Sequence, residues 1–307
     1  MSDVKRFGKV AVLMGGTSAE RDVSLNSGRA VLEGLLRQGV DAHGVDIAGP
    51  QDIVDLFAGN YDRAFIVLHG RGGEDGQIQG ALQTLCIPYS GSGVMGSAIA
   101  MDKYRTKLMW GGAGLPTPAY RLLRSPDDLE AAAALGFPLM VKPANEGSSI
   151  GMSRVINAAE LDKAWRLARQ YDDVVIAERW ITGSEYTVAI LGSEALPIIR
   201  LETPNEFYDF DAKYQSDQTG YYIPCGLDEA MERQVQTVAL EAFEAVGASG
   251  WGRVDMMIDE HGEIWLIEVN TVPGMTDHSL VPMAARAQGI DFDALVVKIL
   301  ELTMERV

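Results

Sequence analysis

Short apolar runs and stretches of helical apolar spacing alternate through the first part of the chain. The runs predict buried strands at 9–16, 41–47 and 63–70. Helical spacing predicts helices at 24–39 and 51–58. Ser24 is placed to cap the first helix and Gly39 to end it. Because strands that alternate with helices form parallel sheets, we expect ligands at the carboxyl ends of these strands, in segments 15–24 and 69–76.

The next two regions have the pattern of α+β units. Helices are predicted at 94–110, 125–136 and 158–170, the second with a Ser-x-x-Asp start. Strands are predicted at 138–144, 154–156, 173–181, 185–191 and 195–203. A polar and aromatic loop at 204–222 precedes a long amphipathic helix that runs from Met231 to Val246. The sequence therefore predicts a mixed α/β and α+β fold with three domains, over 1–97, 98–182 and 183–307.

Two strands near the C-terminus carry polar side chains at alternate positions. Segments 250–259 and 262–271 are separated only by a turn at His261-Gly262, so we expect them to pair antiparallel. Arg253 and Asp255 share one face of the first strand, and Glu268 and Asn270 share one face of the second.

Asp255, Glu268 and Asn270 could then meet in one patch. Two carboxylates and an amide oxygen suit a hard cation such as Mg²⁺, which completes its shell with water and phosphate. The alternative is a set of polar residues on a half-exposed sheet. Apolar flanks favour burial, and a buried carboxylate needs a partner.

Other motifs are weaker. The stretch GSGVMG at 91–96 matches G-x-G-x-x-G but lacks the downstream acidic residue of a dinucleotide site. The stretch GSSIG at 147–151 matches the serine-hydrolase elbow, yet a strand rather than a helix follows it. Its glycines instead suit a loop that covers phosphates, with Lys142 on the preceding strand. There is no P-loop motif, and neither the cysteines nor the histidines have zinc-ligand spacing.

Composition limits the class of protein. The 307 residues are 47% hydrophobic and 22% charged, as in a globular protein, and no stretch of about 18 apolar residues predicts a membrane span. A net charge of −17 argues against a general nucleic-acid binder. Cys86 and Cys225 show no pairing pattern, so we expect a cytoplasmic protein.

Taken together, these motifs resemble a known family. The paired GRVD and EVN strands, the lysine before a Gly/Ser loop and the lack of a P-loop resemble the ATP-grasp superfamily. The match is closer to D-alanine–D-alanine ligases, and it runs in order from about residue 9 to the C-terminus. The segments that carry it are GGTSAERDVSLNSG, LHGRGGEDG, GSGVMGSAIAMDK, VKPANEGSSIGMS, DAKYQSD, GWGRVDMM and EVNTVPGMTDHSLVP.

The resemblance implies an ATP-grasp fold and the ATP-dependent joining of two D-alanines for the peptidoglycan precursor. ATP would phosphorylate the first D-alanine, and the amine of the second would attack the acyl phosphate. It also implies two Mg²⁺ or Mn²⁺ ions on Asp255, Glu268 and Asn270, and a homodimer.

Further roles are implied position by position. In the nucleotide site, Lys103 and Lys142 would contact phosphates, Glu178 the base, Glu185 the ribose and Lys213 the γ-phosphate. In the D-alanine sites, Glu20 would bind the first ammonium with His69 near its carboxylate, Arg253 and the Gly274 amide would stabilise the oxyanion, and Ser279 with the Leu280 amide would hold the second carboxylate.

The loop at 204–222 would act as a lid. Glu20, Ser148 and Tyr214 would form a hydrogen-bonded group that closes this loop over the site. In relatives that make D-alanyl-D-lactate the loop differs, so Tyr214 favours an amine as the second nucleophile. The alternatives are an ATP-grasp ligase with a different acceptor, such as a hydroxy acid, and a nucleotide-binding regulator without catalysis.

Overall fold

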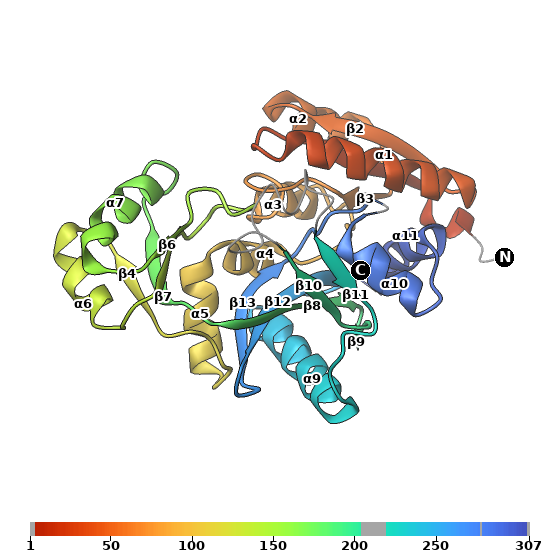
Figure 1. Cartoon of the computed structure of the whole chain (residues 1–307). Helices are drawn as coiled ribbons and strands as arrows, with labels where there is room; N and C mark the ends of the chain where they lie inside the picture. The colour runs from red at the N-terminus through yellow and green to blue at the C-terminus, as the bar shows by residue number, and fades with distance from the viewer. Residues whose placement is uncertain (1–3, 204–218, 277, 306–307) are drawn as a thin grey trace.

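A computed structural model describes residues 4–203, 219–276 and 278–305. The described chain contains three sheets, and each sheet lies in a different part of the molecule (Figure 1). The first is a parallel sheet in the order β2-β1-β3, built from Lys9–Gly15 (β1), Asp41–Ile47 (β2) and Arg63–Ile66 (β3). The helices that accompany it are Val4–Phe7 (η1), Arg21–Arg37 (α1), Pro50–Ala58 (α2) and Gln77–Thr84 (α3). The predicted parallel sheet is confirmed.

The first long helix begins earlier than its capping pattern predicted. Ser24 does not cap it; α1 begins at Arg21, and Glu20 stands at the N-cap position. The Ser24 hydroxyl instead points inward, donating to Val67 O at 2.6 Å and accepting from the Gly15 amide at 2.9 Å. The hydroxyl satisfies buried backbone groups at the ends of β1 and β3.

The predicted helix at 94–110 is broken in two. Val94–Met101 (α4) ends before Asp102, and Lys103–Gly112 (α5) begins after it. Asp102 has an extended backbone (φ −93°, ψ 98°), and its carboxylate accepts from the Arg105 amide as an N-cap. The break places Lys103 in the first turn of α5.

The second sheet is antiparallel, in the order β4-β7-β5-β6. Its strands are Tyr120–Leu123 (β4), Leu139–Pro143 (β5), Ser153–Val155 (β6) and Val175–Arg179 (β7). The helices beside it are Pro126–Asp128 (η2), Leu129–Ala133 (α6) and Ala158–Ala168 (α7). The predicted start at Ser125 is confirmed, because Ser125 and Asp128 form a capping box, but the segment divides into a 3₁₀ turn and a short helix.

The third sheet runs β11-β10-β8-β12-β13, with β9 paired to β8. Its strands are Gly183–Leu191 (β8), Glu194–Ala195 (β9), Ile199–Glu202 (β10), Gly220–Tyr222 (β11), Trp251–Asp259 (β12) and Ile264–Asn270 (β13). The long predicted helix is Glu229–Ala245 (α9), which packs below this sheet in Figure 1. Buried residues of α9 and the sheet, including Phe243 and Val254, form one apolar core.

The last helices return to the N-terminal unit. Leu280–Ala287 (α10), Phe292–Glu301 (α11) and Leu302–Glu305 (η3) complete the described chain. Leu280, Val296 and Leu300 share a core with Val31 and Leu35 of α1. In Figure 1, α11 lies beside α1. This packing anchors the turn that follows β13 against the N-terminal sheet. Among the residues that the structure describes, no helix is long and apolar enough to cross a membrane.

Candidate functional site

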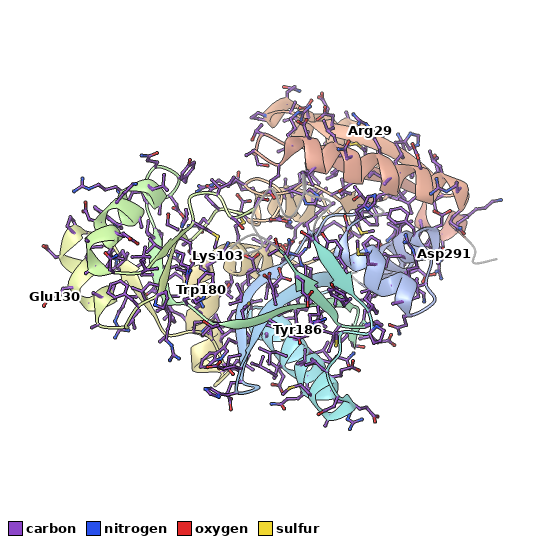
Figure 2. The ribbon with its side chains drawn as sticks, in the orientation of Figure 1. Arg29, Lys103, Glu130, Trp180, Tyr186 and Asp291 are labelled. Atoms are coloured by element: carbon purple, nitrogen blue, oxygen red, sulfur yellow. The ribbon has the colours of Figure 1, made fainter. Side chains whose placement is uncertain are left out.

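Two adjoining cavities lie between the three sheets. The first is about 490 Å³, and the second is about 540 Å³. Lys103 and Glu268 line both, so the cavities meet at these two side chains. Lys103 lies deep in the molecule, whereas Arg29, Glu130 and Asp291 lie at its margins (Figure 2).

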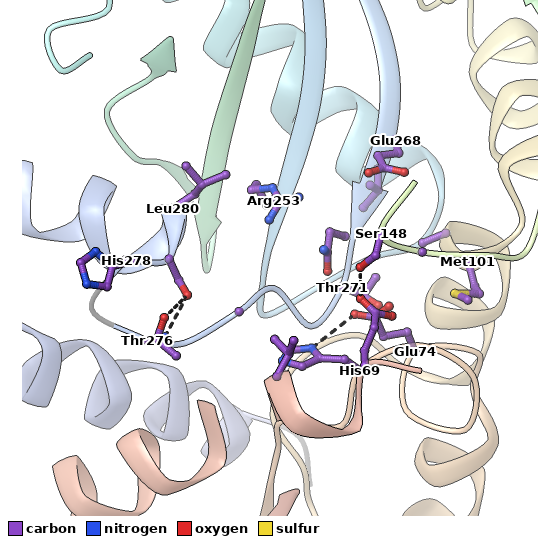
Figure 3. Close-up of a pocket in the computed structure, with 18 of the residues that line it drawn as sticks. His69, Glu74, Met101, Ser148, Arg253, Glu268, Thr271, Thr276, His278 and Leu280 are labelled. Carbon is purple, nitrogen blue, oxygen red and sulfur yellow. Dashed lines mark hydrogen bonds and ion pairs between the residues drawn. The ribbon is translucent and has the colours of Figure 1, made fainter. Parts of the chain in front are cut away.

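Every candidate residue that the structure describes lines one of these cavities. The first cavity holds Glu20, His69, Lys103, Ser148, Arg253, Glu268, Asn270, Gly274, Ser279 and Leu280 (Figure 3). The second holds Lys103, Lys142, Glu178, Glu185, Asp255 and Glu268. Lys213 and Tyr214 lie outside the described residues.

A serine from the glycine-rich loop meets a carboxylate of the N-terminal unit in the first cavity. Ser148 donates a hydrogen bond of 2.5 Å to Glu20 Oε1. Ser148 and Ser149 both have left-handed backbones, with φ of 52° and 61°. A Cβ at Gly147 would lie 2.9 Å from Glu20 Oε2, so glycine allows this close approach. The loop therefore folds onto Glu20 in a compact turn.

His69 is held in one orientation by its neighbours. Its Nδ1 lies 2.8 Å from Val272 O, so Nδ1 carries a proton and donates. Nε2 faces Ser27 Oγ at 3.5 Å, and Glu74 Oε1 lies 3.8 Å from Nδ1 (Figure 3). Burial raises the pKa of Glu74 above its usual range, more than the hydrogen bond and charge of His69 lower it.

An arginine and a carboxylate form a two-point pair on β12. Arg253 donates from Nε and Nη2 to the two oxygens of Asp255, both at 2.7 Å, and Thr187 Oγ1 donates to Asp255 at 2.5 Å. Both charged side chains are about nine-tenths buried. The pair is fixed because each carboxylate oxygen has a donor.

The start of α10 forms another polar wall of the first cavity. Ser279 stands at the N-cap of α10, and its hydroxyl accepts from the Thr276 amide at 2.9 Å (Figure 3). A Cβ at Gly274 would lie 3.0 Å from Ser279 Oγ. The backbone of this turn can therefore approach a bound group closely, next to the amides that begin a helix.

The candidate metal ligands lie on the two strands that the sequence predicts to pair. Arg253 is opposite Asn270 and Asp255 is opposite Glu268 in the antiparallel register, so the expected pairing is confirmed. The Lys103 ammonium lies 3.2 Å from Glu268 Oε2. The three candidate ligands offer oxygen donors only, as Mg²⁺ prefers. Within the described residues, no cluster of three histidine, cysteine, aspartate or glutamate side chains is arranged for a metal.

The register changes beside these ligands. Asp255 pairs with Glu268 but Met256 pairs with Leu266, so Ile267 is an extra residue in β13. As a result Ile267 and Glu268, which are neighbours in sequence, both line the second cavity. A regular strand would have turned them to opposite faces.

The second cavity combines apolar walls with a buried charged end. Its apolar lining is Met140, Met152, Trp180, Ile181, Leu201, Met257 and Ile267. At the charged end, Lys142 forms a short ion pair with Glu178 Oε1. Flat apolar walls beside a few fixed polar groups suit a planar base attached to an anionic group.

Behind this pair lies Lys107, which the sequence reading missed. Its side chain has no exposed surface, and its ammonium lies 2.7 Å from Glu178 Oε2. Burial lowers the pKa of Lys107 to about 8, against the attraction of Glu178. Burial also tends to raise the pKa of Glu178, but Lys107 and Lys142 together outweigh it and the pKa is lowered. Lys107 lies four residues after Lys103 on a predicted helix, so the sequence places the two lysines side by side. This spacing was the signal that could have identified Lys107.

Other residues of the first cavity were also missed. They are Asn26, Glu74, Thr276 and His278. Glu74 lies in the segment after β3 that was expected to carry ligands, and Asn26 lies on α1, six residues after Glu20. Thr276 and His278 follow the β13 turn, a segment without a periodic pattern of apolar residues.

Two family models match the chain. One, described as the D-ala D-ala ligase C-terminus, matches residues 109–301, and the other, the D-ala D-ala ligase N-terminus, matches residues 53–92. The D-alanine–D-alanine ligase of Methylococcus capsulatus is 60% identical over 302 residues, which cover 98% of this chain and 97% of that protein.

Solved structures agree with this match. The crystal structure of the D-alanine–D-alanine ligase of Bacillus anthracis is similar with a TM-score of 0.88 at 35% identity, covering 97% of each chain. The structure of the Bacillus anthracis ligase complexed with ATP gives a TM-score of 0.85 at 32% identity, again covering 97% of each chain. The predicted ATP-grasp arrangement of α/β and α+β units is confirmed, and the chain belongs to the D-alanine–D-alanine ligase family.

Proposed function

We propose that this chain catalyses the ATP-dependent joining of two D-alanines into D-alanyl-D-alanine for the peptidoglycan precursor. The observation that carries the proposal is the meeting of the two cavities at Lys103 and Glu268. One cavity has the apolar walls that a nucleotide base needs, and the other has the charged groups that two amino acids need. A phosphoryl group passed between them would cross the point where they join.

The nucleotide would lie in the second cavity. Glu178 would face the base and Glu185 the ribose, while Lys142 and Lys103 would contact the phosphates. The placement of Lys103 at the cavity junction, with Lys142 in the second cavity, supports this order. We assign Lys213 to the γ-phosphate from the family resemblance.

The first D-alanine would lie beside Glu20. Its ammonium would bind Glu20, and its carboxylate would lie near His69 and accept the γ-phosphoryl group. The carboxylate oxygen attacks phosphorus and ADP leaves, which gives an acyl phosphate. Ser148 holds Glu20 in place through its hydrogen bond, and Tyr214 would complete this group when the 204–222 segment closes.

The second D-alanine would enter at the start of α10. Ser279 and the Leu280 amide would bind its carboxylate. Its neutral amine attacks the acyl carbon, the oxyanion accepts from Arg253 and the Gly274 amide, and phosphate leaves as the peptide bond forms. The proton that the amine loses leaves with the phosphate, so the step balances.

Asp255, Glu268 and Asn270 would hold Mg²⁺ or Mn²⁺, as two ions. The all-oxygen donor set supports this assignment, and so does its place beside the phosphate-binding lysines. Bound there, the ions would neutralise charge on the transferring phosphoryl group. Arg253 pairs with the carboxylate of Asp255, and Lys103 pairs with that of Glu268.

We also propose that the protein acts in the cytoplasm as a homodimer, with domains over 1–97, 98–182 and 183–307. Free thiols at Cys86 and Cys225 suit a reducing compartment. The net charge of −17 supports small-molecule partners, D-alanine and ATP, over nucleic acid.

Measuring phosphate release from ATP in the presence of Mg²⁺ tests the function. We expect release with D-alanine, none with L-alanine, and D-alanyl-D-alanine as product. A parallel reaction with D-alanine and D-lactate tests the acceptor, and a depsipeptide product would replace the amine acceptor with a hydroxy acid. ATP binding without D-alanine-dependent release would instead support a regulator.

A further inference from the structure

Three charged side chains form a closed cluster at the base of the nucleotide cavity. Glu178 sits between two lysines, with the Lys142 ammonium on Oε1 and the Lys107 ammonium on Oε2. All three side chains are at least 95% buried. Lys142 and Glu178 line the cavity, whereas Lys107 lies behind them and does not.

The charges in this cluster do not balance. Two ammonium groups and one carboxylate leave a net charge of +1. Without Lys107, Glu178 and Lys142 would form a neutral pair, and the positive charge of Lys142 would be offset before a phosphate reached it. Because Lys107 neutralises Glu178 from behind, the charge of Lys142 stays available to the cavity.

Keeping Lys107 charged in this buried position lowers the stability of the fold. Its ammonium has a hydrogen bond to Thr117 Oγ1 at 2.6 Å and lies 5.6 Å from the centre of the Tyr120 ring. These contacts and Glu178 do not fully offset burial, since the pKa of Lys107 is lowered. Replacing a whole buried ion pair or triad by apolar side chains is often neutral or stabilising. Packing alone therefore does not account for a charged group at this position.

A chain of hydrogen bonds connects Lys107 to the metal-ligand strand. Thr117 Oγ1 accepts from Lys107 and donates to Leu266 O at 3.0 Å, next to the extra residue Ile267. The Leu266 amide donates to Pro116 O at 2.9 Å. Lys107 thus fixes Glu178 on one side and contacts the segment that supports β13 on the other.

We propose that Lys107 is a positioning residue for the nucleotide, which holds Glu178 and leaves the charge of Lys142 available to the phosphates of ATP. The proposal rests on the proposed function only for the identity of the nucleotide. It assigns to Lys107 an electrostatic role, without contact to the ligand.

The test compares the affinities for ATP and adenosine, measured by calorimetry at one fixed Mg²⁺ concentration and pH 7. The ratio used is the affinity for ATP divided by the affinity for adenosine. This ratio isolates the contribution of the phosphates, because changes in base recognition affect both ligands. We expect Lys107→Met to lower this ratio by about tenfold or more, as for one unit charge within about 10 Å. Lys163→Met removes one charge from an exposed position of α7 and should leave the ratio within about twofold of wild type.

Charge restoration separates this role from a structural one. Glu178→Gln removes the attraction that keeps Lys107 protonated, so the pKa of Lys107 falls further, the cluster keeps a net charge of +1 and the ratio should stay near the wild-type value. The double variant Lys107→Met/Glu178→Gln returns the charge to +1 and should return the ratio to near the wild-type value.

An unchanged ratio in Lys107→Met, or a double variant no better than Lys107→Met, would overturn the proposal. If Lys107→Met does not fold, a ratio that falls in Glu178→Gln overturns it equally. Wild-type phosphate release with D-alanine is measured beside these. Release with an unchanged ratio refutes the role of Lys107 alone, and the expected ratios without release refute the proposed function alone.

Discussion

Removing the Ser148 hydroxyl should cost the enzyme most of its efficiency with D-alanine. In Ser148→Ala, Glu20 loses a hydrogen bond of 2.5 Å from a donor that is 8% exposed. A hydrogen bond to a charged group contributes about 1.5–3 kcal/mol. Each 1.4 kcal/mol is a factor of ten, so kcat/KM for D-alanine should fall about 10- to 100-fold.

The same change should leave ATP binding almost intact. Ser148 lines the first cavity and not the second, so we expect the affinity for ATP to change by less than about twofold. The assay is steady-state phosphate release over a series of D-alanine concentrations, with calorimetry for ATP. Ser193→Ala, an exposed serine in the β8–β9 turn, is the matched control.

Ser148→Gly tests the backbone part of the reasoning. Both variants lose the hydrogen bond to Glu20, but glycine adopts φ of 52° without the cost of about 1–2 kcal/mol that a Cβ carries there. The glycine variant should therefore melt no lower than the alanine variant. A Ser148→Ala enzyme with kcat/KM within about twofold of wild type would refute the role given to this contact.

Three further outcomes are expected. Glu268→Gln should abolish turnover by weakening the metal site, and near-normal phosphate release in saturating Mg²⁺ would contradict that role. Gly96→Ala should lower the melting temperature, by about 1–3 kcal/mol of stability, because its Cβ would lie 2.2 Å from Gly247 O; an unchanged melting temperature would show that the helix can shift. The affinity for ATP should be highest below pH 7 and fall as pH rises through about 8, because the lowered pKa of Lys107 means that its ammonium loses its proton there. The groups that face this ammonium are Glu178, Lys142, Lys103 and the Tyr120 ring. Calorimetry of ATP binding from pH 6.5 to 9 checks this, and the slope should be smaller in Lys107→Met.

Local patterns predicted much of this fold. The parallel N-terminal sheet follows from alternating strands and helices, and the β12–β13 pair follows from the short turn at His261. Features that depend on tertiary contacts were predicted less well. Serine is a common N-cap residue, but the Ser24 hydroxyl is buried and bonds to Val67 O and Gly15 N instead. In this position it satisfies more backbone groups inside the fold. Apolar spacing alone predicts one helix at 94–110, whereas Asp102 divides it into two.

The candidate site was predicted in the same uneven way. Glu268, Asp255 and Asn270 are visible in sequence because polar residues interrupt apolar strands. Lys107 is not, because a lysine on a helix usually lies at the surface and only the packing of β4 and β7 around it shows that it is buried. Burial of a charged group is a property of its surroundings, which no local pattern contains.

The extra residue in β13 explains how one strand serves both cavities. With regular alternation, Ile267 would face away from the side that carries Glu268. The shift of register puts both on the second cavity, so an apolar wall and a carboxylate at the cavity junction come from consecutive residues. Because side chains in a strand have a period of two, deleting Ile267 would turn either Glu268 and Asn270 or the preceding apolar residues to the wrong face. The irregularity is therefore what allows a buried apolar strand to end in a charged site.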